Sequence, residues 1–127
     1  MGDHRFRPKE HLRRPADFRR VYDGRASASD NALIVYAWPN ALPHNRLGLS
    51  VSRKHGGAVV RNRIRRLLRE AYRLGKCTLP TGFDLVIVPR SGPMPPLAEL
   101  VVNFPILVRA AVARAQQKQV PPHADPA

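Results

Sequence analysis

The residues best suited to chemistry lie between Arg61 and Arg73, where six arginines are accompanied by one acid, Glu70. On a helix, like charges four residues apart destabilise the structure by a few tenths of a kcal/mol per pair, and bound phosphates would remove that cost. A solvated face with alternating charges is the alternative, and it needs more than one acid. The spacing therefore predicts a polyanion-binding helix. Four arginines at this spacing form what we call the arginine ribbon: Arg61, Arg65, Arg69 and Arg73.

The charge balance of the whole chain favours the same partner. Its 127 residues include 22 Lys and Arg against 9 Asp and Glu, which gives a net charge of +13 at pH 7. Most of the cations are arginine, whose planar guanidinium pairs with phosphate and stacks on bases. Solvated charge in an arginine-rich composition is the alternative, but it does not explain why the arginines cluster. We expect a nucleic acid as the partner.

No catalytic residue and no protein-held metal site are predicted. Cleavage of a phosphodiester by two metal ions needs clustered carboxylates, whereas the acids here are scattered and Glu70 stands among arginines. The five histidines lack ligand spacing, and Cys77 is the single cysteine. His55 is a candidate for phosphate contact, with a solvated turn histidine as the alternative. A protein that cleaves RNA by itself is therefore a distant possibility.

The chain is predicted to be cytoplasmic, with no membrane partner. It has no stretch of ~18 uninterrupted apolar residues, the length that spans a bilayer. Its beginning, Met1-Gly2-Asp3-His4-Arg5, has no apolar signal region behind it.

Apolar spacing and turn residues predict helix, strand, strand, helix, strand, helix, with a further short strand left open before the central helix. Phe18 and Tyr22 share one face of the first helix. Pro105 should kink the last helix or mark a restart with Asn103 as its cap. The predicted ranges are 15–24, 31–38, 46–52, 58–74, 83–88 and 97–117.

The strand at 46–52 has one small polar face, because leucine and valine alternate strictly with Gly48, Ser50 and Ser52. Strand, helix and strand at 46–52, 58–74 and 83–88 predict a crossover with two parallel strands. The fold class is therefore α+β with a central mixed sheet. We predict one domain over 12–117, a basic flexible arm over 1–11 and a disordered tail over 118–127.

The segment from Arg46 to Arg73, RLGLSVSRKHGGAVVRNRIRRLLREAYR, closely resembles the signature of the protein subunit of bacterial ribonuclease P. The glycine-serine strand, the basic pair, Gly57-Ala58-Val59 and the Arg61-Asn62-Arg63 box follow in order without a gap. Weaker resemblance extends over roughly Leu12–Arg114. The resemblance implies a two-layer, ribosomal-protein-like sandwich with a left-handed crossover, although ~98% of such crossovers are right-handed.

The resemblance also implies a function. Members of this family do not cut RNA themselves; they bind a catalytic RNA, expected at one protein per RNA, and contact the 5′ leader of precursor transfer RNA, while Mg²⁺ is held mainly by the RNA. Positions that match contacts to the catalytic RNA are Arg53, Lys54, Arg61, Asn62, Arg63, Arg66 and Arg73. Positions that match the leader-binding cleft are Phe18, Tyr22, Tyr36, Ser50, Arg65, Arg69 and Arg90.

Two further interpretations stay open. A structural ribosomal or other ribosomal-RNA-binding protein would be equally basic, but it does not predict an aromatic groove for a single strand. The groove itself is predicted from Phe18, Tyr22 and Tyr36, with Gly48, Ser50 and Ser52 as its floor. The alternative is that Phe18 and Tyr22 are core residues that pack the first helix onto the sheet.

Overall fold

The computed structural model describes residues 7–119. All six predicted elements are present, and a short additional strand precedes the second predicted one. One 3-10 turn precedes them within the described residues, and two lie between them. The helices and strands are α1 (Pro15–Gly24), β1 (Ser27–Ser29), β2 (Leu33–Pro39), β3 (Arg46–Leu49), α2 (Ala58–Gly75), β4 (Phe83–Pro89) and α3 (Leu97–Lys118); the turns are η1 (Pro8–Glu10), η2 (Arg53–His55) and η3 (Lys76–Thr78).

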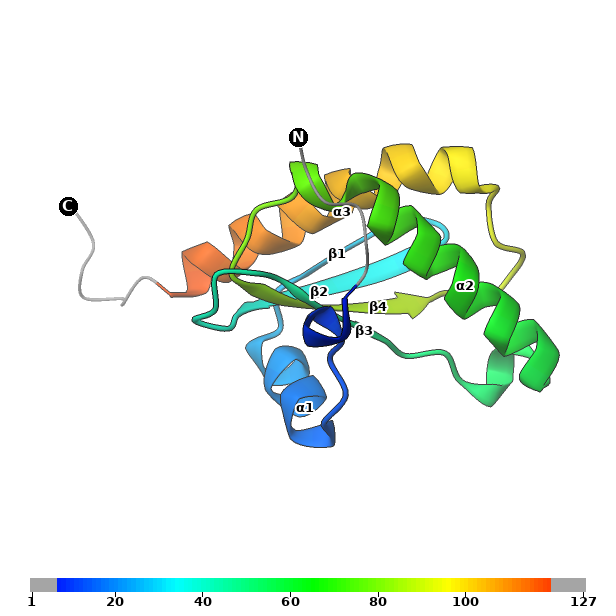
Figure 1. Ribbon diagram of the computed structural model, residues 1–127, viewed down its shortest axis with the longest axis horizontal. Helices are drawn as coiled ribbons and strands as arrows, with labels where there is room; N and C mark the ends of the chain where they lie inside the picture. Colours follow the sequence, from blue (N-terminus) through cyan, green and yellow to red (C-terminus); the bar gives the residue numbers. More distant parts are fainter. Residues whose placement is uncertain (1–6, 120–127) are drawn as a thin grey trace.

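The four strands form one mixed sheet in the order β1-β2-β4-β3 (Figure 1). β1 and β4 are antiparallel to β2, whereas β3 is parallel to β4, as predicted for the crossover. β4 lies in the sheet interior, which explains its continuous apolar run of Leu85 to Val88. β3 is shorter than predicted and ends at Leu49, although the amide of Ser50 still donates to the carbonyl of Ile87 at 3.0 Å.

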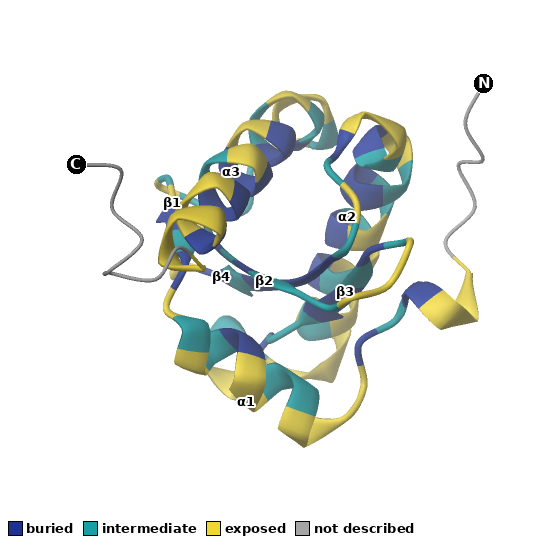
Figure 2. Ribbon diagram, turned by 90° about the vertical axis from the view of Figure 1, so that its left-hand side faces the viewer, coloured by how far each residue is buried: buried dark blue, intermediate teal, exposed yellow. Residues whose placement is uncertain are grey.

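The helices lie on both faces of the sheet. Figure 2 shows α2 and α3 side by side above it and α1 below it. The larger core lies between the sheet and the two long helices and includes Leu85, Ile87, Leu68 and Phe104. The predicted two-layer sandwich thus describes the sheet with α2 and α3, and α1 covers part of the other face.

The crossover through α2 is left-handed, as the resemblance implied. Figure 2 looks along β3 and β4 from the end where they begin, and β4 lies to the left of β3 with α2 above them. A chain that runs away along β3, returns through α2 and enters β4 on the left makes a left-handed turn. This is the exception to the general rule for such units.

α3 passes through Pro105 without interruption, so the predicted restart with Asn103 as a cap is wrong. A proline inside a helix removes one backbone hydrogen bond. Pro105 is buried against α2, where its ring lies 3.5 Å from the position a Cβ would take on Gly75. Apolar packing of the helix thus offsets the lost hydrogen bond.

The start of the described chain is packed, not loose. Glu10 is buried, and its carboxylate accepts two hydrogen bonds from Nζ of Lys76, at 2.9 and 3.1 Å. The amide of Leu12 donates to the carbonyl of Leu47 at 2.9 Å. Packing therefore begins earlier than the boundary predicted at Leu12. Residues 1–6 of the predicted arm and 120–127 of the predicted tail lie outside the described residues, and Lys118 is the last residue of α3.

Candidate nucleic-acid interface

The sheet face that carries α1 presents three rows of side chains. Side chains alternate between the two faces of a strand, and the register aligns β2, β4 and β3 residue by residue. The first two rows therefore take one residue from each of these three strands, and the third includes Ser50, which directly follows β3 and continues its pairing with β4. The first row is Trp38, Asp84 and Arg46; the second is Tyr36, Val86 and Gly48; the third is Ile34, Val88 and Ser50.

α1 lies over the second row. A Cβ on Gly48 would come within 2.5 Å of Cζ of Phe18, so the phenyl ring rests directly on the glycine. Tyr22 meets Tyr36 edge to face, with ring centroids 5.0 Å apart and planes at 89°; we call these two the aromatic pair. The prediction that Gly48 belongs to an open groove floor is wrong, because Phe18 fills the space that the missing side chain leaves.

The third row stays open. Beside it lies a hollow of about 500 Å³, whose floor is Ile34, Val88 and Ser50. Ser52, Lys54 and Arg90 line it too, so Lys54, assigned to the catalytic RNA, shares a hollow with two residues assigned to the leader cleft. The imidazole of His55 fixes one wall, since Nε2 lies 2.9 Å from the carbonyl oxygen of Pro89.

A second hollow, of about 370 Å³, is lined by residues of both α1 and α2. It brings together Phe18, Arg65 and Arg69, three residues assigned to the leader cleft. His11 lines it as well, a residue that sequence reasoning placed in a loose arm. Burial lowers the pKa of His11, and the charges of Arg13 and Arg69 act in the same direction. The imidazole is thereby favoured as a neutral hydrogen-bonding group.

The arginine ribbon divides into two parts. Arg61, Arg65 and Arg69 have no acidic partner within residues 7–119, and Arg65 donates to the side-chain oxygen of Asn62 at 3.3 Å. Arg73 instead makes a two-pronged pair with Glu70, at 2.7 and 2.8 Å. This hydrogen bonding lowers the pKa of Glu70. Three ribbon arginines are thus available to phosphate, while the fourth is already neutralised.

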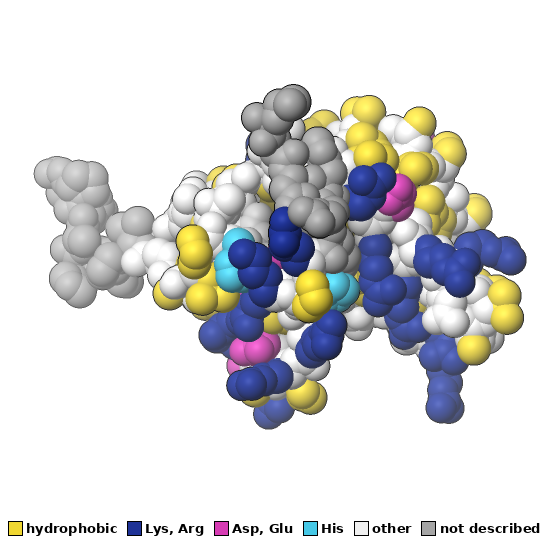
Figure 3. Space-filling model, in the orientation of Figure 1, with side chains coloured by type: hydrophobic (Ala, Val, Ile, Leu, Met, Phe, Trp, Pro, Cys, Tyr) yellow, Lys and Arg dark blue, Asp and Glu magenta, His cyan; other side chains and the backbone are white. Residues whose placement is uncertain are grey.

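The other residues assigned to the catalytic RNA lie along one edge of the molecule. Arg53 and Lys54 are exposed on η2, and Asn62, Arg63 and Arg66 are exposed on α2. Figure 3 shows Lys and Arg side chains gathered over α2 and around α1, with few acids between them. The fold therefore sets the cationic side of α2 beside the open part of the sheet.

A cluster that sequence reasoning missed surrounds Asp84. This carboxylate is fully buried and accepts hydrogen bonds from Arg46 at 2.7 and 2.8 Å, from Arg20, and from the amide nitrogen of Asn40 at 2.9 Å. Asp17 lies 3.6 Å from Arg46. The cluster joins α1 to β3 and β4, so Arg20 and Arg46 hold the fold together.

Within residues 7–119 no three His, Cys, Asp or Glu side chains lie close enough together to hold a metal ion by themselves. In the same part of the chain, no helix combines the length and apolar character that crossing a bilayer requires.

These features define a class: a small α+β protein with a cationic helix beside an open sheet face, suited to a single strand of nucleic acid. The chain belongs to the ribonuclease P protein family, because the family model described as Ribonuclease P matches residues 6–112. The ribonuclease P protein component of Petrotoga mobilis is 40% identical over 104 residues, which are 82% of each chain. That of Lachnoclostridium phytofermentans is 46% identical over 83 residues, or 65% of this chain and 72% of the relative.

Solved structures agree with this fold. The ribonuclease P protein of Staphylococcus aureus superposes with a TM-score of 0.67 at 28% identity, covering 80% of this chain and 94% of that one. The Thermotoga maritima protein gives a TM-score of 0.61 at 30% identity, covering 88% and 98%. The predicted family and fold class are confirmed.

Proposed function

We propose that this chain is the protein cofactor of an RNA-based ribonuclease P, in which it binds the catalytic RNA and positions the 5′ leader of precursor transfer RNA. The observation that carries the proposal is that two ribbon arginines, Arg65 and Arg69, line one hollow with Phe18 of α1, while Lys54 and Arg90 line a second hollow over the open sheet floor. Cations track the phosphate backbone, and aromatic rings accept any base. This combination suits leaders whose sequences differ.

The residues of the chain determine which roles we assign to the protein and which to the RNA. Arg61, Arg65 and Arg69 supply affinity, while Phe18, Ser50 and Arg90 line the proposed leader path. The described residues form no carboxylate cluster, so we assign the Mg²⁺ that the reaction needs to the RNA. We also propose one protein per catalytic RNA and a cytoplasmic location. A purely structural ribosomal protein is not favoured, because the relatives above share both the sequence and the fold.

Reconstitution tests this function. Rigorously RNA-free protein with Mg²⁺ should leave precursor transfer RNA intact, and addition of a bacterial ribonuclease P RNA should give correct 5′ maturation. The RNA alone at the same Mg²⁺ concentration is the control, and the protein should increase its rate. Cleavage by the protein alone that disappears in Glu70→Gln would contradict the proposal.

A further inference from the structure

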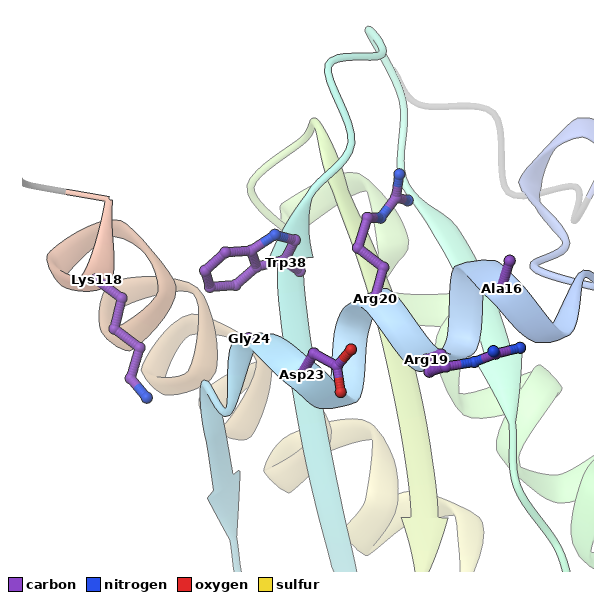
Figure 4. A pocket seen from close by; sticks show the side chains of 7 residues that line it. All are labelled: Ala16, Arg19, Arg20, Asp23, Gly24, Trp38 and Lys118. Carbon is purple, nitrogen blue, oxygen red and sulfur yellow. The ribbon is translucent and has the colours of Figure 1, made fainter.

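A third hollow, of about 480 Å³, lies beside α1 and is lined by neither residue of the aromatic pair (Figure 4). Its walls are one flank of α1, Trp38 on β2 and Lys118 at the end of α3. Arg19 and Asp23 are four residues apart and so share this flank of α1. This hollow, which we call the indole hollow, thus shares no lining residue with the two hollows of the proposed leader path.

Trp38 is held in place by a glycine. A Cβ on Gly24 would come within 2.3 Å of Cε3 of the indole, so the ring lies against the bare backbone at the end of α1. Figure 4 shows the indole at the rim of the hollow, between the end of α1 and Lys118. The indole is half-buried, and its N–H makes no hydrogen bond within residues 7–119. A planar aromatic group is thus fixed at the edge of an open site.

The charges around the indole hollow are of two kinds. Arg20 is bound to the buried Asp84, so it is not free for a ligand. Arg19 and Asp23, in contrast, have no ion pair within the described residues. Lys118 donates one N–H to the carbonyl of Arg25 at 2.9 Å, which leaves its other two available. Two cations and one acid therefore face the hollow without ionic partners, a net charge of +1.

We propose that the indole hollow binds one nucleotide of a single-stranded RNA, with its base stacked on Trp38 and its phosphate attracted to Lys118 and, farther along α1 beyond Asp23, to Arg19. An aromatic platform with cations beside it is the combination by which proteins hold single strands without reading their sequence. Asp23 opposes the phosphate and weakens the site. The nucleotide comes either from a distal part of the leader or from the catalytic RNA, and this assignment of sources rests on the function proposed above.

Trp38 is the single tryptophan of the chain, so its fluorescence reports on this hollow directly. Titration with hexauridylate should quench the indole emission to saturation. Arg19→Gln combined with Lys118→Gln should raise the half-saturating concentration roughly 5-fold or more, as expected for loss of two positive charges near the phosphate. Arg14→Gln removes a charge from the start of the same helix, outside the hollow, and should have less than half that effect. Asp23→Asn should lower the half-saturating concentration.

Two results would overturn the proposal. The first is that hexauridylate binds, as measured by the fluorescence anisotropy of a labelled strand, without changing the indole emission. The second is that Arg14→Gln raises the half-saturating concentration as much as the double variant does. Tyr22→Ala separates this site from the leader path, since quenching should persist in that variant. If Tyr22→Ala leaves leader binding unchanged while the indole emission is quenched as predicted, the proposed leader path is wrong and the proposed indole hollow site is supported. Quenching by precursors with long but not short leaders identifies the leader as the source, and quenching by the catalytic RNA alone identifies that RNA.

Discussion

Two sets of arginines in this molecule have opposite roles. Arg20 and Arg46, around α1 and β3, are bound to a carboxylate that has no exposed surface. Arg65 and Arg69, on α2, face a hollow and have no acid within reach among residues 7–119. The difference is the presence of Asp84, which lies 64 and 38 residues along the chain from Arg20 and Arg46. An arginine count therefore overstates the surface available to RNA.

The largest effect should come from breaking the first set. Asp84→Asn leaves Arg20 and Arg46 without their carboxylate, and removal of one partner of a buried pair typically costs ~3–5 kcal/mol. We expect the lower end of that range, because the side chains of Arg20 and Arg46 are 44% and 22% exposed. Urea unfolding measures this loss. Arg69→Gln is the control, and it should change stability by no more than ~0.5 kcal/mol. Equal stability of the two variants would remove the distinction between the sets.

The next effect concerns the aromatic pair of Tyr22 and Tyr36. Tyr22→Ala should weaken binding of precursor transfer RNA by ~1–3 kcal/mol, the usual worth of one stacked base. Mature transfer RNA, which lacks the leader, should bind almost as before. The test is to measure the affinity of the variant for both RNAs, together with the midpoint of its unfolding in urea. If both RNAs weaken equally, or if the variant unfolds, Tyr22 belongs to the core.

The second set of arginines should determine how strongly RNA binding depends on salt concentration. If Arg69 neutralises one phosphate, Arg69→Ala should reduce the slope of log affinity against log salt concentration by ~0.7–0.9. Binding of the catalytic RNA across a range of salt concentrations provides the slope. An unchanged slope would mean that Arg69 faces solvent in the complex.

The smallest effect separates Arg73 from the rest of the ribbon. Since Glu70 already neutralises Arg73, Arg73→Ala should reduce the same slope by less than Arg69→Ala does. Glu70→Gln should release Arg73 and increase the slope by at most ~0.9. The two variants measured side by side provide the test, and a decrease in Arg73→Ala as large as that in Arg69→Ala would show that Glu70 gives up its partner to RNA.

Much of the fold could be predicted from the sequence because the signals are local. Strict alternation placed Leu47 and Val51 in the core, and helical spacing placed Ile64 and Leu68 there. The family followed from an uninterrupted motif between Arg46 and Arg73. The restart at Asn103 was wrong because the burial of Pro105 against another helix is not visible in local pattern.

The site was predictable in part. Spacing alone determined that Phe18 shares a helix face with Tyr22, and that the arginines of α2 outnumber its one acid, Glu70. Only the tertiary structure decided that Phe18 fills the space above Gly48 and that His11 joins the hollow beside Arg69. These outcomes depend on which strands become neighbours and which side chains reach across them. A sequence determines residue type and period, whereas burial and pairing arise from contacts between residues that are distant along the chain.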